Sequence, residues 1–280
     1  MNVEIDALIR SLKGKSESWL MRGSNKRYYF VKFHGNLKAP YIAFNELVAS
    51  ALGRKLNLPI PNATVVNIPR CFTEPPPESH PISKLAPVGE RLQYSGFHVG
   101  IEPAAQPDTP IFDYLPTSKL KSVVNLWEAA GALVFDKWVC NTGVRQFVYS
   151  PCDQGGYRLT MIDQSCSFGG ASSVFWDFQA LGVYPDRCLY SNIVNLDSFE
   201  PWLSDIESIS EVEIAECFES VPREWRESAP GRTSQIIREL LKRRDSVREM
   251  ISKTLRTLEV AQSRLHRDRI RSDEREITSI

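Results

Sequence analysis

The stretch that decides the fold is MRGSNKRYYFVKFHGN, residues 21–36. It predicts two strands joined by a turn. The small and polar residues from Gly23 to Asn25 are typical of a turn, and the run from Tyr28 to Phe33 is rich in aromatic and β-branched residues, which favour strands. Lys32 is therefore expected on the second of the two strands.

The following segment, PYIAFNELVASALGRKLNLPIP (residues 40–61), predicts a helix. Pro40 suits a first helical turn, and apolar residues then recur at spacings of three and four. Asn57 and Pro59 end the periodic pattern. Glu46 is therefore expected on a helix that directly follows the strand of Lys32.

The remaining sequence predicts short strands over 63–68 and 96–102, with a proline-rich loop at 69–92 between them. A helix is expected from Lys119 to about Cys140, capped by Ser118. Its expected buried side consists of Leu120, Val123, Val124, Trp127, Leu133, Val134 and Trp138. Two strands at 146–150 and 157–162 enclose the turn CDQGG, and one long helix is expected from Thr233 onward, with a polar, fraying end after Leu265.

Composition narrows the function classes. The 280 residues are 42% hydrophobic and 24% charged, and 34 basic residues balance 34 acidic ones, so a nucleic-acid partner is not indicated. The N-terminus lacks the apolar segment of a signal peptide, and no stretch is apolar enough to cross a membrane. The six cysteines show no metal-ligand spacing, which favours reduced thiols and a cytoplasmic protein.

Four features occur in an informative order: the turn from Gly23 to Asn25, the strand lysine Lys32, the helix glutamate Glu46, and Asp163 at the end of a strand. Phosphoryl transfer from ATP uses such parts. A small-residue turn lets backbone N–H groups approach phosphates, a lysine held by a carboxylate neutralises phosphate charge, and an aspartate binds Mg²⁺.

Each of these residues also has a plain structural alternative. Lys32 fits an outward side chain on an amphipathic strand, Glu46 fits a solvated helix face, and Asp163 fits a turn. Only their order and their placement on the predicted elements favour the nucleotide hypothesis.

The quoted segments also resemble a known family. The runs VKF-x-GN and NE…L-x-LPIP resemble the N-lobe of HipA-like kinases, and GALVFDKWVCNTGVRQFVY…YRLTMIDQSCSF resembles their catalytic segment. FWDFQALGVYPDRCLY…LDSFEPWL is similar to a bacterial branch of that family. The resemblance covers about residues 18–205. It implies an α+β, bilobal, protein-kinase-like fold, with a small β-rich N-lobe over 1–102 and a larger helical C-lobe over 103–280.

The resemblance implies roles for particular residues. ATP would be bound by the phosphate loop Gly23, Ser24 and Asn25, by Lys32 and Glu46, and by His98, Gly100 and Glu102 at the hinge near adenine. Asp163 and Gln146 would bind Mg²⁺, and Asn141, Arg145 and Gln146 would form the catalytic loop.

That loop departs from the family pattern at Gly143. The related run is N-x-D-G-R-Q, whereas residues 141–146 read NTGVRQ, so an aspartate that would accept the substrate proton is replaced. Asp136 is more simply explained by packing or capping, and Asp153 by exposure in a hairpin turn. The expectation is that ATP binding survives better than phosphoryl transfer.

Three hypotheses follow. The chain is an ATP-dependent kinase directed at serine or threonine, on a protein substrate or on itself. Alternatively, it is a pseudokinase that binds nucleotide and acts through a protein partner. A third possibility is an interaction protein built around the C-terminal helix, although basic and acidic residues alternate there, as on a solvated helix face.

Overall fold

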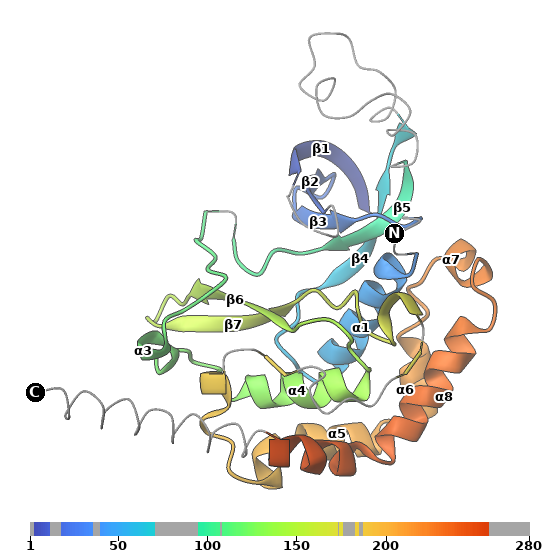
Figure 1. The fold of residues 1–280 in the computed structure, drawn as a ribbon. Helices are drawn as coiled ribbons and strands as arrows, with labels where there is room; N and C mark the ends of the chain where they lie inside the picture. Colours follow the sequence, from blue (N-terminus) through green and yellow to red (C-terminus); the bar gives the residue numbers. More distant parts are fainter. Residues whose placement is uncertain are drawn as a thin grey trace, which may run out of the picture.

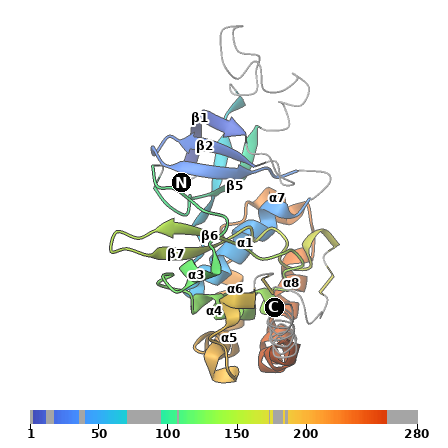
Figure 2. The same ribbon diagram turned by 60° about the vertical axis from the view of Figure 1, so that its left-hand side comes forward.

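The computed structural model describes residues 3–11, 18–35, 40–70, 95–106, 108–172, 174–175, 183–184 and 187–257. The first part of the chain forms a small barrel of strands, and the second part is mainly helical (Figure 1). A view turned by 60° shows the same two layers, with a two-stranded sheet between the barrel and the helices (Figure 2).

The barrel has the strand order β1-β2-β3-β5-β4 and closes through parallel pairing of β1 with β4. Its strands are β1 (Val3–Ser11), β2 (Trp19–Gly23), β3 (Tyr28–Lys32), β4 (Ala63–Ile68) and β5 (Gly96–Ile101). The interior is a small core of its own, made of Ile5, Met21, Tyr29, Val31, Phe33, Val66 and Ile68. β1 is absent from the strands predicted above, because two register shifts along it break the alternation that marks a strand.

Helix α1 (Ile42–Lys55) joins the barrel to the helical part. It lies between β4 and β5 on one side and α4 (Glu128–Trp138) on the other (Figures 1 and 2). Its apolar residues, such as Leu47 and Val48, belong to the same large core as Phe135 of α4. Although α1 follows the barrel strands in sequence, its packing therefore ties it to the helical part.

The second part contains the hairpin of β6 (Gln146–Pro151) and β7 (Tyr157–Ile162). Its other helices are α3 (Thr117–Leu120), α5 (Trp202–Ser208), α6 (Glu211–Glu216), α7 (Arg223–Glu227) and α8 (Arg232–Arg244), followed by a helical segment at 247–257. α7 reaches back to the barrel, where Trp225 stacks on His34 with ring centroids 4.3 Å apart. None of the helices in the described ranges is long and apolar enough to cross a bilayer.

The continuous helix expected from Lys119 to Cys140 is wrong. The chain is helical only in α3 and α4, and the residues between them pair with β7 instead: Val124 N–H donates to Tyr157 O (2.8 Å), and the Asn125 side chain binds both backbone groups of Leu159. Val124 and Trp127 were expected on the buried side but are 55% and 56% exposed. Pairing with a distant hairpin has overridden local helical periodicity here.

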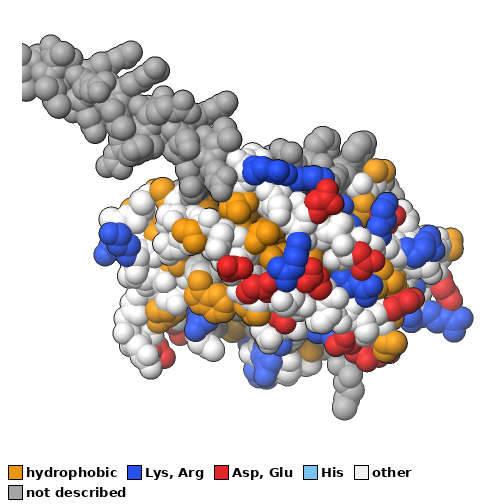
Figure 3. Space-filling model, turned by 90° about the horizontal axis from the view of Figure 1, so that it is seen from below, with side chains coloured by type: hydrophobic (Ala, Val, Ile, Leu, Met, Phe, Trp, Pro, Cys, Tyr) orange, Lys and Arg blue, Asp and Glu red, His pale blue; other side chains and the backbone are white. Residues whose placement is uncertain are grey.

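The long C-terminal helix is also interrupted. α8 ends at Arg244, and helix resumes at Val247 after a turn. Apolar residues on both sides of this interruption are nevertheless buried, with Leu240, Val247 and Ile251 each 0% exposed. On the face formed by the C-terminal helices, acidic and basic side chains are interspersed (Figure 3). The loop predicted at 69–92 lies outside the described residues from residue 71 onward, as does the end after Leu265.

Gly131 permits the close contact of α4 with α5. An added Cβ at this position would lie 2.2 Å from the indole ring of Trp202. We expect Gly131→Ala to lower the free energy of unfolding by about 1–3 kcal/mol, because a packed ring cannot move aside cheaply. Urea unfolding measures this loss.

The matched control is Gly53→Ala on α1, where the added Cβ would meet the flexible tip of Ile60 at 2.2 Å. This variant should lose less unfolding free energy than Gly131→Ala, since the Ile60 side chain can rotate and alanine favours a helix. Equal losses in the two variants would contradict the packing argument.

Candidate functional site

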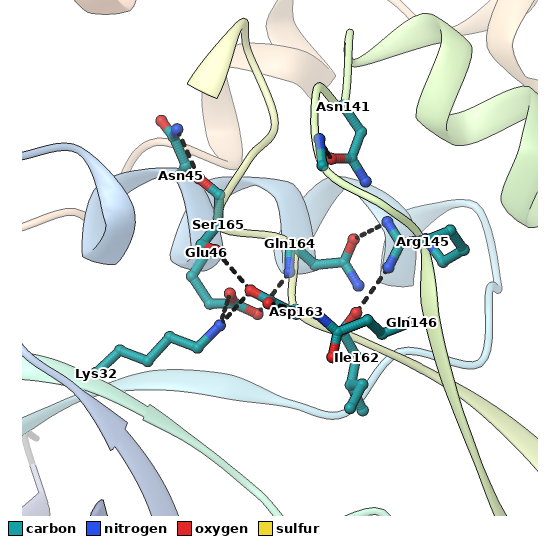
Figure 4. A network of polar contacts seen from close by, with 11 residues as sticks. Lys32, Asn45, Glu46, Asn141, Arg145, Gln146, Ile162, Asp163, Gln164 and Ser165 are labelled. Carbon is teal, nitrogen blue, oxygen red and sulfur yellow. Dashed lines mark hydrogen bonds and ion pairs between the residues drawn. The ribbon is translucent and has the colours of Figure 1, made fainter. Parts of the chain in front are cut away.

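Lys32 stands at the end of β3 and joins three distant segments. Its Nζ donates to Glu46 Oε2 on α1 at 2.7 Å and to Asp163 Oδ1, directly after β7, at 2.6 Å (Figure 4). Lys32 is 6% exposed and Glu46 1%. The plain structural alternatives, an outward strand lysine and a solvated helix glutamate, are therefore wrong.

The backbone places these groups by different means. Lys32 pairs with Val99 of β5, so its strand is held on both sides. Asp163 has a φ of 61°, in the left-handed region that residues other than glycine adopt uncommonly. Strained backbone of this kind persists where surrounding contacts enforce it, and it occurs most often at functional sites.

The charges of the cluster support one another. Burial alone would raise the pKa of Asp163, but the Lys32 ammonium, the Ser165 hydroxyl and Arg145 outweigh burial and lower that pKa to about 2. Burial likewise opposes the charge on Lys32, yet Glu46 and Asp163 raise its pKa above the ordinary value. The lysine and Asp163 therefore stay charged at neutral pH, as a phosphate and metal site requires.

Asn141 and Arg145 form a buried frame rather than a surface for substrate. Arg145 donates to both carboxylate oxygens of Asp136, to Gln164 Oε1 at 2.8 Å and to Ile162 O at 2.7 Å. Asn141 Nδ2 donates to Asp136 Oδ1 at 2.9 Å. Arg145 and Asn141 are each 1% exposed, so in this structure their polar groups bind within the frame, and their role in a catalytic loop stays a prediction. The packing role predicted for Asp136 is confirmed, since it is fully buried.

Gly143 lies at the exposed edge of this frame and carries no acid. Its N–H donates to Asn141 Oδ1 at 3.0 Å, in a tight turn. An added Cβ would lie 2.9 Å from Cys166 Cβ and 3.1 Å from Cys166 Sγ. Cys166 therefore occupies part of the space that a larger residue at position 143 would need.

Gln146 is exposed, and its Nε2 donates to Asp163 Oδ2 at 3.0 Å. One carboxylate and one amide suit Mg²⁺, which is commonly bound through one or two protein oxygens together with substrate phosphates. Within the described part of the chain, no three His, Cys, Asp or Glu side chains gather to hold a metal. Asp163 and Gln146 are the two residues of this cluster whose oxygens could hold such a metal.

The turn from Gly23 to Asn25 lies away from this cluster. It joins β2 to β3 at the Tyr28 end, whereas Lys32 stands four residues further along, about 13 Å away at the usual strand rise. The Gly23 and Ser24 N–H groups already donate to Arg27 O (2.9 Å) and Glu4 O (2.7 Å). The phosphate-binding role predicted for this turn therefore stays a prediction, and in this structure two of its N–H groups already have backbone partners. At the Lys32 end of the neighbouring strands, Ser11 pairs with Trp19 and Trp19 pairs with Val31.

The three hinge residues are also engaged elsewhere. His98 is 2% exposed, and its Nδ1 accepts from His34 N–H at 3.0 Å. Gly100 faces the barrel interior, where an added Cβ would lie 2.5 Å from Val66. Glu102 N–H donates to Asn62 O at 2.9 Å, and the Glu102 carboxylate pairs with Arg27. The side chains of His98 and Glu102 therefore have partners outside the Lys32 cluster, although His98 and Gly100 flank Val99, the β5 partner of Lys32.

Two residues not singled out from the sequence complete the cluster. Ser165 Oγ donates to Asp163 Oδ1 at 2.5 Å, and Asn45 Nδ2 donates to Ser165 O at 3.0 Å and Ser167 O at 2.8 Å. Asn45 directly precedes Glu46, so the Asn-Glu pair noted above was the available signal. Ser165 offered none beyond its closeness to Asp163.

The lowered pKa of Asp163 gives a pH prediction for Lys32→Met. The folded pKa of about 2 lies below the usual 3.8, so the stabilisation is present above about pH 4 and is lost as the pH falls through 2. For one side chain this is worth about 2 kcal/mol. In Lys32→Met, burial of Asp163 is no longer opposed by the lysine, so the carboxylate takes up a proton at higher pH.

We therefore expect the loss of unfolding free energy in Lys32→Met, relative to the native chain, to be largest near pH 7 and to shrink toward pH 3. Urea unfolding across this range measures the gap. Arg22→Met, which breaks a half-exposed pair with Asp6, is the control and should cost little. A gap that did not change with pH would contradict the assigned charges.

Comparison with solved structures shows the fold. A structure of hydra Fam20 with sugar matches with a TM-score of 0.54 at 12% identity, covering 90% of this chain and 87% of that one. The Helicobacter pylori proinflammatory kinase CtkA matches with a TM-score of 0.52 at 12% identity, covering 93% and 99%. The Golgi casein kinase with Mn/ADP bound matches at 0.50 and 12%, covering 89% and 72%. The predicted α+β kinase-like fold, with a small strand-rich part and a larger helical part, is confirmed.

Comparison with protein families identifies the sequence relationship. No curated protein matches the chain. The family model described as HipA-like kinase matches residues 5–256, which is most of the sequence. The predicted resemblance is thereby confirmed, and the chain belongs to the HipA-like kinase family.

Proposed function

We propose that this protein binds ATP with Mg²⁺ and transfers its terminal phosphoryl group slowly, to a serine or threonine of a protein partner or of its own chain. The observation that carries the proposal is the Lys32 ammonium held between Glu46 and Asp163. A related fold has been solved with Mn/ADP, which supports the use of nucleotide and divalent metal.

In this proposal Glu46 orients Lys32 toward the phosphates, and Asp163 with Gln146 holds the metal. Lys32 would bind phosphate oxygens in place of its contact with Asp163, which would leave that carboxylate for the metal. Bound Mg²⁺ would neutralise negative charge that develops on the phosphates. The division into an N-lobe over 1–102 and a C-lobe over 103–280 also belongs to the proposal, with α1 packed on the C-lobe.

Slow transfer follows from the loop at Gly143. A positioned base typically contributes about 10² to 10⁴ in rate, and Asp136 cannot serve because it is buried and paired with Arg145. Positioning and charge stabilisation, which supply most phosphoryl-transfer catalysis, are retained. The same observation favours the second candidate function, a pseudokinase that binds nucleotide without useful turnover.

Metal-dependent nucleotide binding is the first test. We expect Mg²⁺ to strengthen ATP binding to the native chain, and Asp163→Asn to remove about tenfold or more of that metal-dependent gain, because one carboxylate ligand is lost. Isothermal titration calorimetry with and without Mg²⁺ measures both. Asp153→Asn, an exposed aspartate in the β6–β7 turn, is the matched control and should bind as the native chain does. No ATP binding by the native chain would end the proposal.

Restoring the acid is the second test. Gly143→Asp combined with Cys166→Gly should raise phosphate transfer by about 10² to 10⁴, whereas Gly143→Asp alone should gain less because its Cβ is crowded by Cys166. Phosphate release and autophosphorylation, followed by mass spectrometry, measure the gain. Cys166→Gly alone is the control. Fast transfer by the native chain would show that Gly143 does not mark a missing base, and no gain in the double variant would favour the pseudokinase.

A further inference from the structure

A buried arginine far along the sequence reaches the site from the C-terminal helices. Arg232 is the first residue of α8 and follows Gly231, whose φ of 80° lets the chain turn into the helix. Arg232 is 5% exposed, and its guanidinium lies 3.7 Å from the centre of the Tyr41 ring. Its Nη2 donates to Asn45 Oδ1 at 2.7 Å. α8 is therefore attached directly to the start of α1.

Asn45 links Arg232 to the segment that follows Asp163 in sequence. Asn45 is 0% exposed, and its Nδ2 donates hydrogen bonds to both Ser165 O and Ser167 O. An arginine can only donate, so Arg232 requires the oxygen of the Asn45 amide to face it. The NH₂ group is then forced toward the two carbonyls. Arg232 thus selects one of the two possible orientations of the Asn45 side chain.

The segment bound by Asn45 directly follows Asp163 and contacts its carboxylate. Ser165 Oγ donates to Asp163 Oδ1 at 2.5 Å, and Gln164 N–H donates to Glu46 Oε1 at 3.1 Å. Two neighbouring residues of α1, Asn45 and Glu46, therefore hold residues 164–167 from one side (Figure 4). These hydrogen bonds hold the backbone next to Asp163 and thereby its carboxylate relative to Lys32.

We propose that Arg232 is a positioning residue, which keeps the Asp163 carboxylate in place for the metal by fixing the Asn45 amide. The importance of Arg232 for metal binding rests on the proposed function. Its effect on the order of residues 164–168, through Asn45, does not depend on that function. Arg232 touches neither nucleotide nor metal. Burial lowers the pKa of Arg232 to about 10, with Tyr41 acting in the opposite direction, so the guanidinium remains charged at neutral pH.

Hydrogen exchange of the nucleotide-free protein tests this effect on residues 164–168 directly. The N–H groups of Gln164, Ser167 and Phe168 are hydrogen-bonded, so they should be protected in the native chain. We expect Arg232→Met to speed exchange across residues 164–168 by about tenfold more than exchange in α4. Arg232→Lys, which restores a donor for Asn45, should recover part of the protection, whereas a purely space-filling role would leave the two variants alike.

Arg244→Met is the matched control, because Arg244 lies on the same helix and donates to Ile209 O at 3.0 Å, away from α1. It should not speed exchange at 164–168 preferentially. If Arg232→Met fails to fold, Asn45→Asp measures the same link from its other end, since aspartate keeps the pair with Arg232 but cannot donate to the two carbonyls. Unchanged relative exchange at 164–168 in Arg232→Met, or in Asn45→Asp where that variant is used, would overturn the proposal, as would an equal effect of Arg244→Met.

Calorimetry separates this inference from the proposed function. If the native chain binds ATP with Mg²⁺, Arg232→Met should weaken the metal-dependent part of the affinity about tenfold and leave metal-free binding nearly unchanged. Equal weakening with and without metal would overturn the assigned role of Arg232. If the native chain does not bind ATP, the proposed function fails, while the exchange measurement still decides whether Arg232 holds the segment after Asp163.

Discussion

The arrangement of the molecule depends on one buried ammonium group that is shared by two carboxylates. Lys32 meets Glu46, 14 residues away, and Asp163, 131 residues away, so a single side chain connects the barrel, α1 and the segment after β7. Burying three charges is costly unless each is paired and hydrogen-bonded. Glu46 accepts from Gln164 N–H, and Asp163 accepts from Ser165 and Gln146, which provides that compensation. Because α1 packs in the core of the helical part, both carboxylates belong to one packed unit, and the barrel supplies the cation.

Local sequence patterns predicted the elements that carry these three residues. The periodic run at 40–61 became α1, Lys32 lies on the predicted strand as its last residue, and Asp163 directly follows β7, close to its expected place at the end of a strand. β1 was missed because its register shifts disrupt alternation and Ile9 is exposed. The assignment of Gly23, Ser24 and Asn25 as a phosphate loop stays a prediction. The structure places this turn at the Tyr28 end of β3, and Lys32 lies at the opposite end of the strand.

The remaining differences come from contacts that no local window contains. The break between α3 and α4 depends on Asn125, whose side chain satisfies the backbone of Leu159, 34 residues away. A lone asparagine in an apolar helical pattern gives no sign of such a partner. Asp136 shows the same limit. Its packing was predicted correctly, but its pairing with Arg145 could not be predicted, because it depends on the turn between α4 and β6. Residue type and period predict burial here, whereas partners depend on topology.

The buried frame also bears on how the altered loop is interpreted. Asn141 and Arg145 match the family pattern, yet each is buried and hydrogen-bonded within the protein, above all to Asp136. Losing Arg145 would leave a buried carboxylate unpaired, which is strongly destabilising whether or not the protein is catalytic. Their presence is therefore required by folding and says little about turnover. Position 143 differs from positions 141 and 145, because an acidic side chain there would not be needed to pair a buried group of this frame. The absence of an acid at position 143, with Cys166 filling part of the space, therefore bears more directly on the proposed slow transfer than the presence of Asn141 and Arg145 does.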